Sequence, residues 1–181
     1  MFTDERVIDQ CKQWLDEIII GLNFCPFAKK EFVNRTIAYP VLRNVDIESA
    51  LHGLIQECEH LTKHPEISTS LIIFPEEFSF FDDYLDLVAM GEQLLIDQGY
   101  EGIYQIATFH PDYYFADVAE DDVSNYTNRS PFPILHLLRE DSLAKAIKAH
   151  PDPEGIPDKN IEVCDHKGIE FFQQFLVSLR S

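Results

Sequence analysis

The organisation of this chain depends on residues 106–140, IATFHPDYYFADVAEDDVSNYTNRSPFPILHLLRE. The segment begins as a β-like run, passes through a polar and aromatic region, and regains helical spacing of apolar residues after Pro133. A long loop inside a compact domain is usually functional or disordered, and the aromatic residues argue against disorder. We therefore expect the functional site in this loop.

The rest of the chain alternates between helical and strand patterns. Helices are predicted at residues 3–22, 46–62, 80–98, 133–149 and 158–179, and strands at residues 36–42, 68–74 and 102–109. This order predicts an α/β fold with a small, largely parallel three-stranded sheet flanked by helices and a helical C-terminus. No clear linker divides the chain, so residues 1–181 are predicted to form a single domain.

The charge of the chain limits its partners. With 32 acidic against 14 basic residues, the formal net charge is −18, which disfavours binding to nucleic acid or to an anionic membrane. The first residues, MFTDERVIDQCKQW, lack the basic and apolar segments of a signal peptide, and we expect a cytoplasmic protein. The four cysteines are far apart and lack a CxxC pair, which suits reduced thiols.

Several common enzyme motifs are absent from the sequence. It contains no glycine-rich phosphate loop, no GxSxG and no dinucleotide fingerprint. No motif specifies a cofactor, an oligomeric state or a reaction, and the functional candidates are therefore single residues.

Cys25 is the first candidate. Pro26 follows it, as in the first turn of a new helix, and a helix N-terminus lowers the pKa of a thiol and favours the reactive thiolate. The alternative is a small buried residue, because Phe24 and Phe27 flank it and buried free cysteine is common.

His110 is the second candidate. It directly follows the predicted third strand, and ligands in open α/β sheets bind beyond the carboxyl ends of strands. The alternative, which has about equal weight, is that His110 only makes hydrogen bonds within the loop. If the fold brought Cys25 and His110 into contact, the two would form a nucleophile and its base.

Arg129 is the third candidate, and it lies among amide and hydroxyl groups. A guanidinium beside Asn125, Asn128 and Ser130 suits a carboxylate or phosphate on a ligand. The alternative is a structural turn in which Arg129 pairs with Asp117, Asp121 or Asp122.

The remaining polar residues give weaker indications of a functional site. The acidic residues between 112 and 122 lack the spacing of a calcium loop and favour a solvated face. His136 favours packing with one satisfied hydrogen bond. We assign no residue of this chain as a metal ligand.

Three segments of this chain resemble a bacterial family catalogued as domain of unknown function 1415. They carry the patterns NxCPFA, FHPxYxF and TNRSPxPxxHLLRE, at residues 23–28, 109–115 and 127–140. The resemblance covers nearly the whole chain. It implies that Asn23, Cys25, His110, Asn128, Arg129 and His136 belong to one set, and it implies no activity.

The leading hypothesis from the sequence is an enzyme that acts on a small anionic substrate. Cys25 is its predicted nucleophile and His110 the base. Asn23, Asn125, Asn128, Arg129 and Ser130 are the predicted substrate-binding residues. The alternatives are a metal-binding enzyme that uses Cys25 and His110, and a non-catalytic module that binds a metabolite or a protein.

Overall fold

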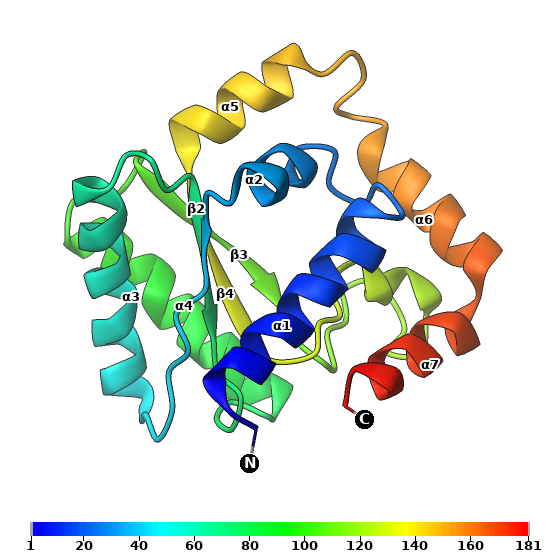
Figure 1. Ribbon diagram of the computed structural model, residues 1–181, viewed down its shortest axis with the longest axis horizontal. Helices are drawn as coiled ribbons and strands as arrows, with labels where there is room; N and C mark the ends of the chain where they lie inside the picture. Colours follow the sequence, from blue (N-terminus) through cyan, green and yellow to red (C-terminus); the bar gives the residue numbers. More distant parts are fainter. Residues whose placement is uncertain (1, 181) are drawn as a thin grey trace.

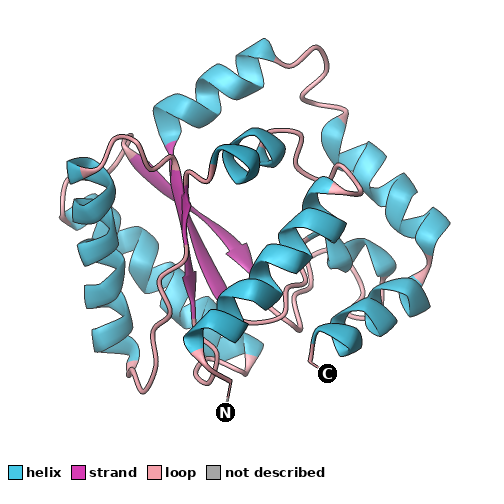
Figure 2. Ribbon diagram, viewed as in Figure 1, coloured by secondary structure: helices cyan, strands magenta, loops and turns pink. Residues whose placement is uncertain are grey.

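The structure, a computed structural model that describes residues 2–180, contains a four-stranded sheet with helices on both faces (Figures 1 and 2). The strands are β1 (Ile37–Ala38), β2 (Thr69–Ile73), β3 (Tyr104–Phe109) and β4 (Ile134–Arg139). Their spatial order is β1-β2-β4-β3. Strand β1 runs parallel to β2, whereas β4 is antiparallel to both β2 and β3.

The predicted α/β class is confirmed, but the prediction of a largely parallel, three-stranded sheet is wrong. Residues 134–139, for which the sequence predicts a helix, form β4, the strand that lies between β2 and β3. The helix predicted there begins only at Glu140, as α5 (Glu140–Ala149). Strand β4 is apolar on both faces, so its sequence ILHLLR shows no alternation that would distinguish a strand from a helix.

Helices α3 (Ile47–Lys63) and α4 (Phe81–Asp97) cover one face of the sheet (Figure 1). They begin and end close to the residues predicted for them. Asp46 caps α3 by accepting a hydrogen bond from the backbone amide of Ser49. Strand residues at alternate positions pack against these helices: Ile72 and Phe74 of the β2 segment, and Leu135 and Leu137 of β4.

The other face is covered by helices from both ends of the chain. These are α1 (Asp4–Trp14), the π-helix η1 (Leu15–Ile20), α6 (Ile156–Lys167) and α7 (Ile169–Leu179). Trp14 meets the ring of Phe109 edge to face, with 5.1 Å between centroids. The single last helix that was predicted is divided at Gly168, which adopts a φ of 76°.

The remaining elements are short or exposed. Helix α2 (Ala28–Asn34) follows Pro26, as predicted, and β1 lies at the sheet edge, where Pro40 was expected to place it. The 3-10 helix η2 (Val123–Thr127) lies within the loop that joins β3 to β4. Within residues 2–180, no helix combines the length and the apolar composition needed to cross a membrane.

Candidate functional site

The loop between β3 and β4, residues 110–133, is closed near its base by backbone hydrogen bonds between His110 and residues 128 and 130. The amide of His110 donates to the carbonyl of Asn128, and the amide of Ser130 donates to the carbonyl of His110. The Asn128 side-chain amide donates to the carbonyl of Thr108 over 3.0 Å. Asn128 and Ser130 thereby hold the loop onto the sheet.

Asn125 organises the interior of the same loop. Its side chain is fully buried, accepts from the amide of Phe115 and donates to the carbonyls of Ala119 and Glu120. The Ser130 hydroxyl is also fully buried and donates to the carbonyl of Phe132. The polar groups of both side chains are thus bonded within the loop and face no open space.

Arg129, in contrast, lines a pocket with its side chain. Its Nε donates to the carbonyl of Tyr113 over 3.0 Å and its Nη2 to the carbonyl of Glu120 over 2.7 Å. The guanidinium also lies 4.6 Å from the centre of the Tyr126 ring. Nη1 has no hydrogen-bond partner among the described residues, so one donor edge of a fixed guanidinium remains open.

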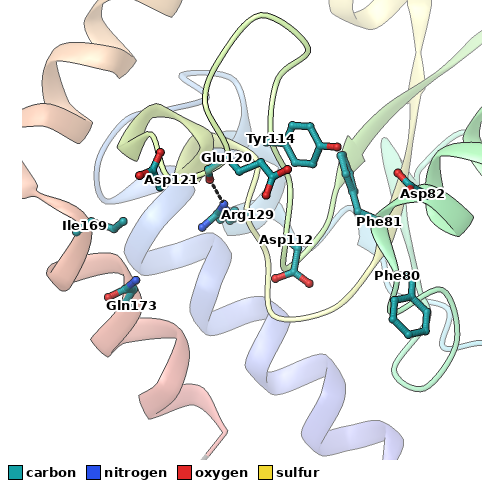
Figure 3. A pocket seen from close by; sticks show the side chains of 10 residues that line it. All are labelled: Phe80, Phe81, Asp82, Asp112, Tyr114, Glu120, Asp121, Arg129, Ile169 and Gln173. Carbon is teal, nitrogen blue, oxygen red and sulfur yellow. Dashed lines mark hydrogen bonds between the residues drawn. The ribbon is translucent and has the colours of Figure 1, made fainter.

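The pocket encloses about 560 Å³. Figure 3 shows Arg129 in its middle, with Asp121 on one side and Asp112 and Glu120 on the other. The lining residues come from the loop, from the start of α4 and from α7: Phe80, Phe81, Asp82, Asp112, Tyr114, Glu120, Asp121, Arg129, Ile169 and Gln173. Three distant parts of the chain therefore contribute to one cavity.

The charges of this pocket are strongly unbalanced. Four of its lining residues are acidic and one is basic. None of the four carboxylates takes part in any ion pair found among residues 2–180. Arg129 does not neutralise them, because its bonds go to backbone carbonyls; the predicted alternative of a pair with Asp117, Asp121 or Asp122 is not formed. The pocket thus carries unpaired negative charge around one positive group.

His110 lies beside the pocket but not in it. Its side chain is fully buried, and its ring lies 5.2 Å from that of Phe81 and 5.1 Å from that of Tyr84. Nδ1 accepts a hydrogen bond from the amide of Asp112 over 3.0 Å, so Nε2 carries the proton that is shared with the carbonyl of Phe78. Burial lowers the pKa of His110, which keeps the imidazole neutral.

Cys25 lies at the start of α2, as predicted, and the amides of Phe27 and Ala28 bond its sulfur. These bonds lower the pKa of the thiol, but burial has the larger effect and raises it. Cys25 packs with the cluster under α1 and α7, whereas His110 contacts the aromatic rings of α4 on the opposite face of the sheet. The thiol chemistry predicted for this pair stays a prediction, and the surroundings of both side chains favour packing.

Two other residues of the sequence motifs, Asn23 and His136, have roles in the local structure. Asn23 is exposed and takes a φ of 57°, where it ends the helix that includes η1. His136 lies in β4, and its Nε2 bonds the hydroxyl of Thr69, which in turn donates to the carbonyl of Leu137. Burial lowers the pKa of His136 to about 4. No three histidine, cysteine or acidic side chains within residues 2–180 are grouped closely enough to hold a metal ion.

Several pocket residues were not found from the sequence. Asp112, Glu120 and Asp121 had been assigned to a solvated acidic face, and Asp82 resembles any acidic residue in the first turn of a helix. Phe80 is 75% exposed, which is unusual for a large aromatic side chain. The sequence held no signal for Gln173, which reaches the pocket only because α7 packs near the loop.

The fold and the pocket define an α/β protein with a mixed sheet and a charged cavity beside the connection from β3 to β4. The chain belongs to the family described as "Protein of unknown function (DUF1415)", whose profile matches residues 6–174. The resemblance inferred from the three motifs is therefore confirmed. Comparison with curated proteins and with solved structures gave no match.

Proposed function

We propose that this chain binds a small ligand that carries both a positively charged and an anionic group, in the pocket around Arg129. The observation that carries the proposal is the combination of four unpaired carboxylates and one immobilised guanidinium in a single cavity. Arg129 keeps the role of anion anchor that the sequence predicted, and the acidic lining adds a requirement for positive charge.

The acidic lining supports a cationic group on the ligand. Asp82, Asp112, Glu120 and Asp121 lie around the cavity without ion-pair partners among residues 2–180, and the net charge of −18 adds a long-range attraction for cations. The rings of Phe81 and Tyr114, with centroids 5.0 Å apart, add aromatic surface. Aromatic faces attract ammonium groups, so rings and carboxylates favour the same part of a ligand.

Arg129 supports an anionic group on the same ligand. Its three contacts fix the guanidinium plane and leave Nη1 open, so little side-chain entropy is lost when Nη1 donates to a carboxylate or phosphate. A dianionic ligand would bring its second charge close to the acidic side chains. The pocket therefore favours a zwitterionic ligand over the purely anionic substrate expected from the sequence.

Binding of three small probes tests the proposal. L-lysine, putrescine and succinate, measured by NMR shift perturbation or calorimetry, represent a zwitterion with an additional cation, a dication and a dianion. We expect L-lysine to bind best and succinate least, with shifts at the amides around Arg129. Equal or tighter binding of succinate would contradict the proposed charge preference.

The substitution Asp82→Asn, with Asp141→Asn as its control, locates the binding. Both acidic residues lie in the first turn of a helix, so both changes remove one charge and a similar helix-dipole interaction of about 0.3–1 kcal/mol. Only Asp82 lines the pocket. We expect Asp82→Asn to weaken L-lysine binding about two- to fivefold and Asp141→Asn to leave it unchanged. Equal effects of the two substitutions would place the ligand elsewhere.

A further inference from the structure

The protonation state of His110 can affect the pocket through a hydrogen bond to the backbone of Asp112. Nδ1 of His110 is an acceptor, and the hydrogen bond it receives comes from the amide of Asp112, a residue that lines the cavity. Nε2 is the donor to the carbonyl of Phe78. Only the neutral imidazole with the proton on Nε2 can make both bonds.

Protonation of His110 acts selectively on the Asp112 side. When Nδ1 takes a proton from solvent, both ring nitrogens become donors, and Nδ1–H then faces the Asp112 N–H. That hydrogen bond is lost, whereas the bond from Nε2 to Phe78 becomes charge-assisted and is retained. The segment from Asp112 to Tyr114, which forms one wall of the pocket, thus loses one of the hydrogen bonds that hold it. The bond from Arg129 Nε to the carbonyl of Tyr113 and the bond from the Tyr113 amide to the carbonyl of His110 remain.

The other groups around the ring do not replace the lost bond. Helix α4 presents the rings of Phe81 and Tyr84, and the Tyr84 hydroxyl already bonds the carbonyl of Ile134 and the amide of Phe109. The end of the loop contacts His110 through its backbone, by the hydrogen bonds with Asn128 and Ser130. The carboxylate of Asp112 is the charged group that acts on the imidazole, and it favours the protonated form.

We propose that His110 is a proton-sensitive positioning residue, which holds Asp112 in the pocket wall when neutral and releases it when protonated. As a statement about ligand binding, the proposal rests on the proposed function of the pocket. As a statement about the loop, it is independent of any ligand. Burial lowers the pKa of His110, so the release occurs below the usual titration range of histidine, on the acidic side of neutrality.

NMR of the ligand-free protein tests the loop. Near neutral pH, the ¹⁵N shifts of His110 should show an unprotonated Nδ1 and a protonated Nε2. As the pH falls, Nδ1 should titrate, and the Asp112 amide should shift upfield and exchange faster with the same midpoint. An Asp112 amide that does not respond while Nδ1 titrates would overturn the proposal, whether or not the pocket binds a ligand.

The substitution His110→Asn tests the coupling to binding. Asparagine can present its Oδ1 near the position of Nδ1 and accept from Asp112, but it cannot be protonated. Wild-type protein should bind L-lysine about three- to tenfold more weakly below the midpoint of the His110 titration than near pH 7.5, which corresponds to the net worth of one hydrogen bond. The variant should lose this dependence, because a side-chain amide takes up no proton in this pH range.

The outcomes separate the two proposals. If L-lysine, putrescine and succinate all fail to bind but the Asp112 amide follows His110, the proposed function fails and the proton-sensitive attachment stands. If L-lysine binds and His110→Asn keeps the full pH dependence, the attachment is overturned and the pocket stands. His110→Gln, whose longer side chain can also donate to Phe78, replaces His110→Asn if the latter does not fold.

Discussion

Within residues 125–130 of the β3–β4 loop, some side chains stabilise the loop itself, and one, Arg129, lines the pocket. Asn125, Asn128 and Ser130 direct their side-chain polar groups to their own loop or to β3, and the carbonyl of Arg129 accepts from the indole of Trp14. Arg129 is consequently held at its backbone by Trp14 and at its guanidinium by the carbonyls of Tyr113 and Glu120. The polar groups of Asn125, Asn128 and Ser130 support the loop that carries Arg129, and their predicted role in substrate binding stays a prediction.

His136 should make the stability of the protein depend on pH. Its pKa of about 4 in the folded state lies below the value near 6.5 of an unfolded chain, so the unfolded state binds the proton more tightly. Stability is therefore complete above about pH 6.5 and is lost as the pH falls toward 4. Between about pH 7 and pH 5, this group should cost about 2 kcal/mol of unfolding free energy.

Urea denaturation of wild-type protein and of His136→Gln measures this contribution. Glutamine keeps a donor for the Thr69 hydroxyl but cannot be protonated, so the variant should lose less stability between the two pH values. His52→Gln, at an exposed position on α3, is the control and should behave like the wild type. If His136→Gln and wild type depend equally on pH, the buried imidazole does not control acid stability.

Strand β4 is the element that determines the topology. It pairs with β2 from Thr69 opposite Leu138 to Ile73 opposite Ile134, and with β3 from Tyr104 opposite Arg139 to Phe109 opposite Ile134. Both of its edges are therefore occupied, and helices cover both of its faces. Helix α5 continues the chain directly from β4 and has no buried residue.

Hydrogen exchange should distinguish β4 from α5 sharply. Amides of residues 135–138 lie between two neighbouring strands and should exchange only through global unfolding, while those of residues 144–149 should open locally and exchange orders of magnitude faster. The amides of α3, a longer helix with buried residues, are the control for helical protection in general. Equal protection of β4 and α5 would instead indicate the continuous helix that the sequence pattern suggested.

Most acidic side chains of the described residues form no ion pair. Five ion pairs of lysine or arginine and one contact between His64 and Glu66 join described residues, and together they involve six of the 32 acidic side chains. At a net charge of −18, self-repulsion opposes the compact state. Added salt screens that repulsion, since the Debye length falls from about 20 Å near 20 mM to about 6 Å near 300 mM.

We therefore expect the melting temperature to rise by several degrees when NaCl is raised over this range. A variant with Glu154→Gln, Glu162→Gln and Asp165→Asn, all exposed positions away from the pocket, removes three negative charges and should respond less. Differential scanning calorimetry measures both. A melting temperature that is insensitive to salt in the wild type would show that the repulsion is already compensated.

The parts of the fold that were predicted correctly are those with strong local signals. Asp46 marks the start of α3, the apolar run of β2 is buried throughout, and Thr3 accepts from the amide of Arg6 as an N-cap of α1. The position of Cys25 before α2 was also correct, although the effect on its thiol pKa was the opposite of that expected. The single-domain organisation of residues 1–181 stays a prediction.

The sequence by itself determined α1, α3 and α4, three of the four strands and the acidic composition, because caps, periodicity and charge are local or additive properties. Only the tertiary structure decided that residues 134–139 form a central strand, since strand pairing depends on partners distant in the chain. The pocket likewise exists only because α4, α7 and the loop from β3 to β4 converge. Desolvation, which fixes the state of His110 and Cys25, arises from that same packing and has no counterpart in the sequence pattern.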